Sequence, residues 1–166
     1  EAIVHMPIFA DGGAAIEPEF VVRLGETRAE DRVFIGVEIA SRPIVGINQI
    51  GALAVVSDFG NNRGLLVGPE IANWREAWAQ PVTVKSYIDG EEVGARELAG
   101  IAQIAGPRDF LIEHAAHSDI ALPVGTLIST GAITGIHDAV VGASSTLDFG
   151  EFGQLNIELV PAHPEV

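Results

Sequence analysis

The sequence predicts a mainly β domain with a few helices (α+β), in which a closed or rolled sheet carries packed helices. Glycine and proline, with 19 and 9 residues, are spread along the whole chain, as expected for many short elements joined by tight turns. Runs rich in Val and Ile recur between these turns, whereas helical spacing is confined mostly to the middle of the chain. The 166 residues contain no linker or repeat, so we expect a single domain over residues 1–166.

The first half of the chain predicts strands. Residues 19–25 and 33–41 are β-branched, apolar and close to glycine, and the polar residues 25–32 between them predict a loop or a short helical turn. Residues 51–68 show an apolar run, an Asn- and Gly-rich turn, and a second apolar run. We therefore expect the polar loop 57–64 to lie between two strands.

The middle of the chain predicts helices. In residues 69–80, Pro69 suits a first helical position, and Ile71, Trp74 and Trp78 recur at helical spacing. This pattern indicates a short amphipathic helix. The other expected elements are a hairpin over 82–94 with a DGEE turn, helices over 95–106 and 107–119 separated at Gly106–Pro107, and strands over 124–135 and 153–162.

Composition limits the possible partners and compartments. Nine Lys and Arg against 23 Asp and Glu leave a net charge of −14, which disfavours binding to nucleic acid. The longest apolar runs are too short to span a membrane, and the absence of cysteine fits a reducing cytoplasm. Metal chemistry would therefore rely on carboxylate and imidazole groups.

Two acids stand one residue apart in the segment IEPEF. Glu17 and Glu19 point to the same face if the segment is extended, and Pro18 stiffens the backbone between them. A third acid, Glu38, lies in the apolar run 33–41, where a lone carboxylate is costly unless it is paired or metal-bound. Spacing alone leaves two interpretations open: a solvated strand face with Arg42 as the partner of Glu38, or a site for a hard divalent cation.

The histidines give weaker evidence for a functional site than the three acids do. His114 and His117 share a face of the helix expected over 107–119 and suit a solvated helix end. His137, followed by Asp138, suits a turn better than a general base. Residues 129–135 offer hydroxyls and glycine N–H groups that could hold a carboxylate, or could equally end a strand. No serine-hydrolase or nucleotide-binding motif is present.

Taken in order, several segments resemble the C-terminal catalytic domain of the fumarylacetoacetate hydrolase superfamily. These segments are IEPEF, GVEIASR, VSDFGNNRGLLVG and ISTGAITGIHDAVVGASSTLDFGEFGQLNIEL. The similarity covers residues 16–160 and is greatest to the branch of 2-oxopent-4-enoate hydratases and 4-oxalocrotonate decarboxylases. It implies a mixed β-roll or barrel of that type, and a homo-oligomer in aromatic compound catabolism.

The resemblance also implies site residues. Glu17, Glu19 and Glu38 correspond to three carboxylate ligands of Mg²⁺ or Mn²⁺. Arg42 and Asp58 correspond to residues near the catalytic site, and the contacts expected with substrate are from Asn61, Thr130 and Gly131. Asn61 and Asn62 stand where the branch carries hydroxyl residues.

The implied activity is that of a hydro-lyase, a 2-hydroxypentadienoate-type hydratase that acts on a small 2-oxo acid through a metal-bound enolate. The same ligands suit a decarboxylase or an acylpyruvate-type C–C hydrolase. The family's N-terminal region, which carries a lysine thought to help catalysis, has no counterpart in residues 1–166, and Lys85 does not replace that lysine. A non-catalytic or incomplete metal-binding module is therefore the alternative from a different class.

Overall fold

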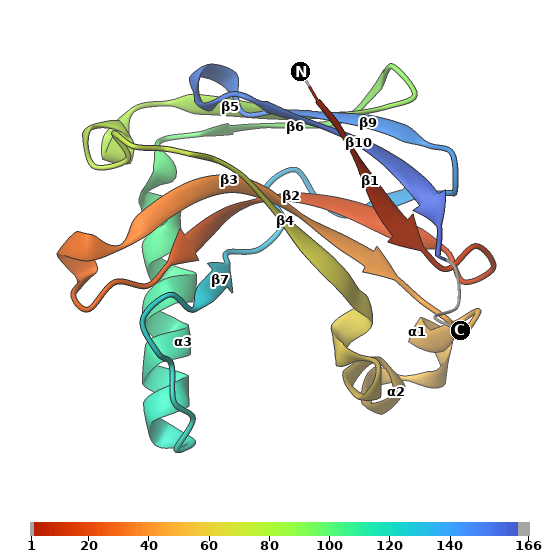
Figure 1. Cartoon of the computed structure of the whole chain (residues 1–166), viewed down its shortest axis with the longest axis horizontal. Helices are drawn as coiled ribbons and strands as arrows, with labels where there is room; N and C mark the ends of the chain where they lie inside the picture. Colours follow the sequence, from red (N-terminus) through yellow and green to blue (C-terminus); the bar gives the residue numbers. More distant parts are fainter. Residues whose placement is uncertain (1, 163–166) are drawn as a thin grey trace.

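The strands form two five-stranded sheets that lie one above the other in this computed structural model, which describes residues 2–162 (Figure 1). The strands are β1 (Ile3–Ile8), β2 (Ala14–Arg23), β3 (Arg32–Ser41), β4 (Asn62–Glu70), β5 (Val82–Ile88), β6 (Glu91–Leu98), β7 (Leu127–Ser129), β8 (His137–Ala139), β9 (Ser144–Asp148) and β10 (Gln154–Pro161). The first sheet has the order β1-β10-β9-β5-β6. The second has the order β4-β3-β2-β7, with β8 also paired to β2. Only β1 and β10 are parallel neighbours among these pairs.

The three α-helices lie at the two ends of the second sheet (Figure 1). The α-helices are α1 (Ile47–Ile50), α2 (Ala52–Ser57) and α3 (Ala105–His117), and the 3₁₀ helices are η1 (Arg28–Glu30), η2 (Phe59–Asn61), η3 (Glu76–Ala79), η4 (Ile101–Ile104) and η5 (Gly150–Phe152). Figure 1 shows α3 at one end, with α1 and α2 at the other, where β4 begins. No helix within residues 2–162 has the length and hydropathy needed to cross a membrane.

The core lies between the two sheets. Along β2, Ile16, Phe20 and Val22 are buried in the hydrophobic core, and the ring of Phe20 lies 5.9 Å from that of Phe149, between centroids. Side chains alternate along a strand, so the residues between these belong to the opposite face of β2. That second face carries the acids of IEPEF.

Several predicted elements are confirmed. β5 and β6 form the expected hairpin, and Asp89 and Gly90 both have positive φ (52° and 84°), as a tight two-residue hairpin turn requires. Strands were also correctly predicted over most of 19–25, 33–41 and 153–162, although β2 begins earlier, at Ala14. Of the strand expected over 124–135, only β7 forms.

Residues 52–57 form α2, so the strand predicted for this apolar run is wrong. Leu53 and Val56 are 85% and 71% exposed on this helix. A short apolar run has the same appearance in a strand and in a helix, so its sequence could not decide between them. The polar residues 57–64 thus connect a helix to β4.

The helix predicted over 69–80 is also wrong. β4 continues through Pro69 to Glu70, and the N–H of Ile71 donates to the carbonyl of Val33, which extends the pairing with β3. Proline is tolerated here because β4 is an edge strand. Only η3, with Trp78, retains a helical turn.

The helix predicted over 95–106 is replaced by three elements. β6 continues to Leu98 because it pairs with β5, and η4 follows. Gly106 and Pro107 lie in the first turn of α3 rather than at a break. Proline fits there because the first-turn N–H groups have no intrahelical acceptor.

Candidate functional site

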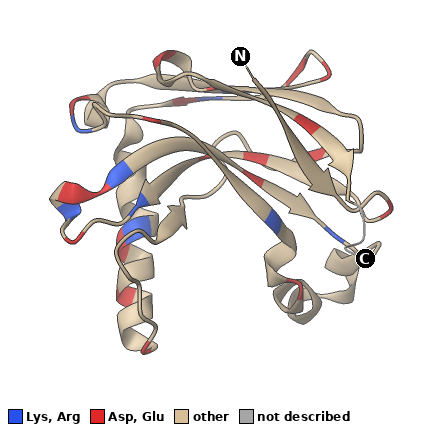
Figure 2. Ribbon diagram, in the orientation of Figure 1, with Lys and Arg blue, Asp and Glu red and all other residues tan. Residues whose placement is uncertain are grey.

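Three carboxylates share the face of β2 and β3 that is turned away from the core. Glu17 pairs directly with Glu38 across the two strands, and Glu19 pairs with Gly36 two positions further along. Because strand side chains alternate, these three belong to one face, opposite that of Ile16 and Phe20. Figure 2 shows acidic positions in the middle of both strands. The predicted sharing of one face by Glu17 and Glu19 is confirmed, and the pairing of β2 with β3 adds Glu38 to it.

Glu19 is the most deeply placed acid, with 2% of its surface exposed. Its Oε2 accepts hydrogen bonds from the hydroxyl of Ser129 and from the N–H of Gly131, the latter at 2.9 Å. Burial raises the pKa of Glu19, and these two donors oppose the rise. The carboxylate is therefore held in one position by the segment that follows β7.

The position of Pro18 in β2 allows the chain that follows β7 to approach Glu19. β7 pairs with residues 21–23 and β8 pairs with residues 14–16, so between them β2 has no strand neighbour on that side. Proline has no N–H to donate, and it occupies this gap. Ile133 donates to the carbonyl of Pro18 instead, at 2.8 Å, and the chain between β7 and β8 wraps around the acid.

Glu17 carries the least compensated charge of the three. Burial, followed by the nearby charges of Glu38 and Glu19, raises its pKa to about 7. None of the ion pairs recorded within residues 2–162 involves any of the three acids. The group therefore has a mutual repulsion that a bound cation would relieve.

Glu38 accepts a hydrogen bond from Nδ2 of Asn62, at 2.9 Å. Of the two interpretations that the sequence left open, the pairing of Glu38 with Arg42 is not found: the recorded ion pair of Arg42 is with Asp138, at 3.9 Å. Asn62 reaches Glu38 because β4 starts beside the end of β3, with Asn62 opposite Ala40. That register could not be deduced from the sequence.

Asp58 and Asn61 lie in the turn between α2 and β4. Oδ2 of Asp58 and Oδ1 of Asn61 are buried without a hydrogen-bond partner among the described residues, and Nδ2 of Asn61 donates to Asn48 at 3.2 Å. Phe59 and Asn61 have positive φ (52° and 64°), which is a strained conformation for residues other than glycine. No contact of Asp58 or Asn61 with the three acids is recorded within residues 2–162, so their predicted roles stay predictions.

Thr130 and Gly131 are brought to the acids. The hydroxyl of Thr130 donates to the carbonyl of Phe20 at 2.9 Å, which fixes the segment to β2, and Gly131 contacts Glu19 directly. Sequence reasoning placed Ser129 in a stretch that could hold a carboxylate. In the structure, the carboxylate that Ser129 contacts belongs to the protein itself.

The recorded hydrogen bond of His137 is with Thr134 and not with any of the three acids. Its Nε2 is 2.8 Å from the hydroxyl of Thr134, which is 2.7 Å from that of Ser86, so the three side chains join β8 to β5. Burial lowers the pKa of His137. At the other end of the molecule, His117 contacts a backbone carbonyl at the exposed end of α3, as expected for a solvated helix end.

The chemistry of the three acids suits Mg²⁺ or Mn²⁺, which prefer oxygen ligands. As the side chains are placed, no group of three His, Asp or Glu within residues 2–162 could hold a metal ion. Glutamate side chains are long and rotatable, and Glu17 and Glu38 are only half-buried. The donor set therefore fits such a cation by type, shared face and surplus charge, with a side-chain rotation needed to bring the oxygens together.

Comparison with known proteins gives structural matches only. No family model matches the sequence, and no curated protein matches it. A 4-oxalocrotonate decarboxylase from Pseudomonas putida G7, complexed with magnesium and adipate, superposes with a TM-score of 0.75 at 19% identity over 95% of this chain. A fumarylpyruvate hydrolase from Pseudomonas aeruginosa, in complex with Mn²⁺ and pyruvate, gives 0.72 at 15% identity over 97%. A 2-hydroxyhepta-2,4-diene-1,7-dioate isomerase from Mycobacterium marinum gives 0.63 at 17% identity over 99%.

These matches establish the fold, which is the one predicted from the resemblance to fumarylacetoacetate hydrolase C-terminal domains. The chain spans 65% of the length of the decarboxylase, 72% of the hydrolase and 65% of the isomerase. At identities below 20%, these matches do not show which reaction the chain catalyses, so any reaction has to be inferred from the residues of the site.

Proposed function

We propose that the chain belongs to the fumarylacetoacetate hydrolase superfamily and forms a divalent-metal-dependent catalytic domain that acts on a small 2-oxo acid. The observation that carries this proposal is the group of three carboxylates on one sheet face, where burial and the nearby charges of Glu38 and Glu19 raise the pKa of Glu17 to about 7. The fold is shared with enzymes whose structures contain magnesium with adipate or Mn²⁺ with pyruvate, which supports the same choice of metal and ligand class.

Glu17, Glu19 and Glu38 would hold the cation. A divalent cation supplies a Lewis acid that polarises the oxygen of a 2-oxo group. Ser129 and Gly131 hold the buried Glu19 by hydrogen bonds, and Asn62 donates to the half-buried Glu38. Such outer contacts determine how well a metal site is preorganised.

The specific reaction that we propose is hydration of a 2-hydroxypentadienoate, and the alternatives are decarboxylation and C–C hydrolysis of an acylpyruvate. The neighbours in structure include a decarboxylase, a hydrolase and an isomerase, so the fold is compatible with several outcomes. Arg42 and Asp58 remain the candidates for catalytic residues, and Asn61, Thr130 and Gly131 remain those for contacts with substrate. A module that binds metal without turnover is the second candidate.

The test is an ultraviolet assay on 2-hydroxypenta-2,4-dienoate with Mg²⁺ or Mn²⁺. We expect metal-dependent loss of the dienoate absorbance, abolished by Glu17→Gln. Retained activity is expected for Glu97→Gln, which removes an exposed acid of β6. Parallel assays of carbon dioxide release from 4-oxalocrotonate and of cleavage of an acylpyruvate distinguish the alternatives. If the cation binds but none of the three substrates reacts, the non-catalytic module is the correct interpretation.

We also propose that the chain forms a homo-oligomer. Six large apolar side chains between residues 44 and 59 are at least half exposed, which is unusual for a surface that stays in water. They are Ile44, Val45, Ile50, Leu53, Val56 and Phe59. We call this set the α1–α2 apolar surface.

A further inference from the structure

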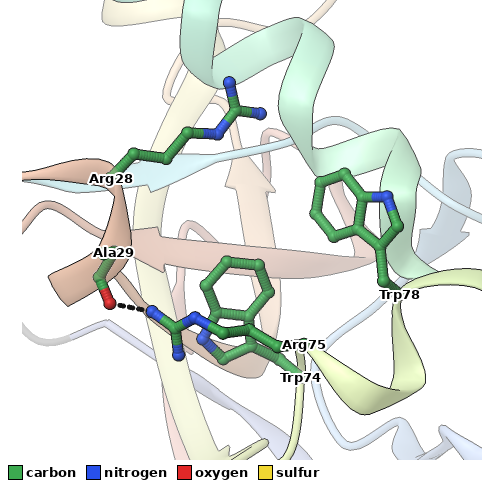
Figure 3. A pocket seen from close by; sticks show the side chains of 5 residues that line it. All are labelled: Arg28, Ala29, Trp74, Arg75 and Trp78. Atoms are coloured by element: carbon green, nitrogen blue, oxygen red, sulfur yellow. Dashed lines mark hydrogen bonds between the residues drawn. The ribbon is translucent and has the colours of Figure 1, made fainter.

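A second site is suggested by a surface hollow of about 460 Å³ that is lined by Arg28, Ala29, Trp74, Arg75 and Trp78 (Figure 3). Its volume lies within the range of small-molecule pockets, about 300–1,000 Å³. The proposed chemistry of the three acids uses none of these residues.

The hollow and the three acids belong to opposite faces of the second sheet. Val22 and Val33 lie against Trp74 and Trp78 in a small cavity that also includes Arg28. These two valines pair with each other and point to the core face, whereas Glu17 and Glu38 pair on the other face. A ligand in the hollow would therefore bind at a site of its own.

The walls of the hollow are two fixed indole rings. Trp74 is 7% exposed, and its Nε1 donates to the carbonyl of Asp31 at 3.2 Å. The ring of Trp78 lies 5.8 Å from that of Trp74, at an interplanar angle of 54°. Figure 3 shows both rings directed into the same space. Because Trp74 is nearly buried and Trp78 is half-buried, Trp78 offers most of the ring surface that a flat apolar group could contact.

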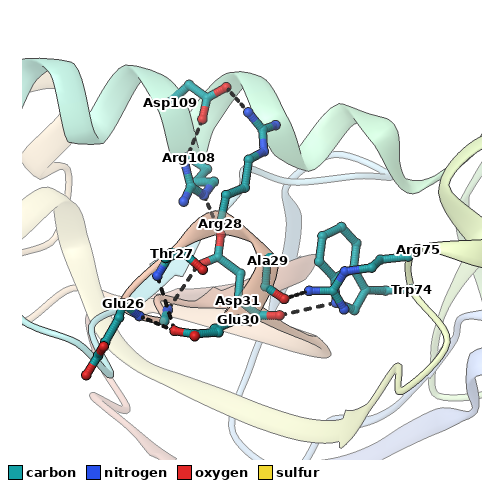
Figure 4. A network of polar contacts seen from close by, with 11 residues as sticks. Glu26, Thr27, Arg28, Ala29, Glu30, Asp31, Trp74, Arg75, Arg108 and Asp109 are labelled. Carbon is teal, nitrogen blue, oxygen red and sulfur yellow. Dashed lines mark hydrogen bonds and ion pairs between the residues drawn. The ribbon is translucent and has the colours of Figure 1, made fainter.

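Three arginines from different elements surround these rings, in a chain that has only nine Lys and Arg and a net charge of −14. Arg28 and Arg108 both pair with Asp109, and Arg108 also pairs with the buried Asp31 at 2.5 Å (Figure 4). Arg75 donates to the carbonyl of Ala29, and its guanidinium lies 4.2 Å from the centre of the Trp74 ring.

Among the described residues, the acids around the hollow form ion pairs with Arg28 and Arg108 and not with Arg75, although Glu76, which follows Arg75, adds a negative charge to the same turn. Glu30 accepts the N–H groups of Glu26 and Thr27, so its carboxylate serves its own loop. Asp31 and Asp109 are used by Arg108 and Arg28. Within residues 2–162, no ion pair is recorded for Arg75. Its charge faces the hollow from above an indole.

We propose that this hollow binds a planar aromatic carboxylate. The ring would lie against Trp74 and Trp78, and the carboxylate would bind to Arg75, with Arg28 as the second donor. Arginine suits this role because its planar guanidinium binds a carboxylate bidentately and also stacks on aromatic rings. The pair of Arg28 with Asp109 is half exposed, and such pairs contribute little, so Arg28 is free to exchange partners.

The experiment uses the intrinsic fluorescence of the protein, because both of its tryptophans line the hollow. Benzoate is titrated with a chelator present and no added divalent metal, next to cyclohexanecarboxylate, which is not planar, and benzamide, which has no charge. We expect a saturable change with benzoate at a Kd on the order of 0.1–1 mM, a range suited to so small a ligand. Each control compound is expected to bind at least about tenfold more weakly.

Substitutions of single arginines test whether benzoate binds in the hollow. Arg75→Gln is expected to weaken benzoate about tenfold, because a charge-assisted contact is lost, and to leave benzamide unchanged. Arg63→Gln is the matched control, since Arg63 is an exposed arginine that also lies over an aromatic ring, that of Phe9, 4.8 Å from its centre. Arg28→Gln provides a second test if Arg75→Gln loses the far-ultraviolet circular dichroism of the fold.

Four results would overturn the proposal. These are equal binding of benzoate and cyclohexanecarboxylate, equal effects of Arg75→Gln and Arg63→Gln, and no saturable change with benzoate at all. The fourth is an emission spectrum that depends on protein concentration and resists benzoate, because it would assign the hollow to a second copy of the chain.

Discussion

Glu17 is the residue at which folding and function are expected to conflict. Its pKa of about 7 lies above its ordinary value of 4.5, so the folded state favours the protonated acid. The stabilisation that this gives is present below pH 4.5 and is lost as the pH rises through 7. The burial of Glu17 and its repulsion with Glu38 and Glu19 therefore weaken the metal-free fold at neutral pH.

Glu17→Gln is predicted to stabilise the metal-free protein by about 1–3 kcal/mol at pH 8. One pKa unit corresponds to about 1.4 kcal/mol, and partial exposure screens part of the repulsion. At pH 4.5 the variant and the wild type should be nearly equal. Thermal melts at both pH values with a chelator measure this, and an equal pH dependence of the two proteins would contradict it.

Ser129 is predicted to stabilise the fold through Glu19. Ser129→Ala removes one of two donors to a buried carboxylate, at an expected cost of about 1.5–3 kcal/mol at pH 8. Urea unfolding measures the cost, with Ser144→Ala as the control for an exposed serine. Equal stability of the two variants would show that Gly131 alone holds Glu19.

At the scale of single residues, the sequence predicted the acids better than their partners. The alternation of side chains in an extended segment is enough to place Glu17 and Glu19 on one face. Asn62 was not predicted as the partner of Glu38, because its position depends on the register of β4, which is shifted between Ile39 and Ala40. A register of this kind is set by tertiary pairing and has no local signal in the sequence.

Among the elements, β6 and β8 meet at a contact that only glycine permits. A Cβ built on Gly94 would lie 2.6 Å from Cε1 of His137 and 3.1 Å from the carbonyl oxygen of Thr134. This contact closes one side of the space between the sheets, since β6 belongs to the first sheet and β8 pairs with the second.

Gly94→Ala is predicted to destabilise the protein by about 1–3 kcal/mol through this overpacking. The control is Gly64→Ala, because among the described residues the one neighbour within 4 Å of a Cβ there is the end of Met6, at 3.5 Å. Denaturant unfolding of both variants checks the prediction. Similar losses of stability would indicate a general cost of replacing glycine in a strand instead.

The elements also show where local pattern fails. The hairpin of β5 and β6 was predicted correctly because its turn residues and alternation agree. Trp74 and Trp78 do recur at helical spacing, but the pairing of β4 with β3 continues to Ile71 and leaves only the single turn of η3. Tertiary pairing overrode the local preference there.

For the whole molecule, the α1–α2 apolar surface is the feature that a lone chain leaves unexplained. Leu53 and Phe59 are 85% and 87% exposed. Exposed apolar patches of this kind mark contact sites, which accords with the proposed homo-oligomer.

The double variant Leu53→Glu, Val56→Glu is predicted to lower the mass of the particle in solution without lowering the melting temperature of the monomer, because neither side chain is buried in the chain itself. Sedimentation measures the mass. Phe110→Glu serves as the control, since Phe110 is 67% exposed on α3, at the other end of the sheet (Figure 1). An unchanged mass for the double variant would exclude this surface as the contact.

The central claim, that the three acids form a cation site, is tested most directly by melting the protein at pH 8 with increasing Mn²⁺. A ligand at one hundred times its Kd adds about 2.7 kcal/mol, so the melting temperature should rise by about 5–10 °C. Glu97→Gln should show the full shift and Glu17→Gln none. No shift in the wild type, or an equal shift in Glu17→Gln, would contradict the claim.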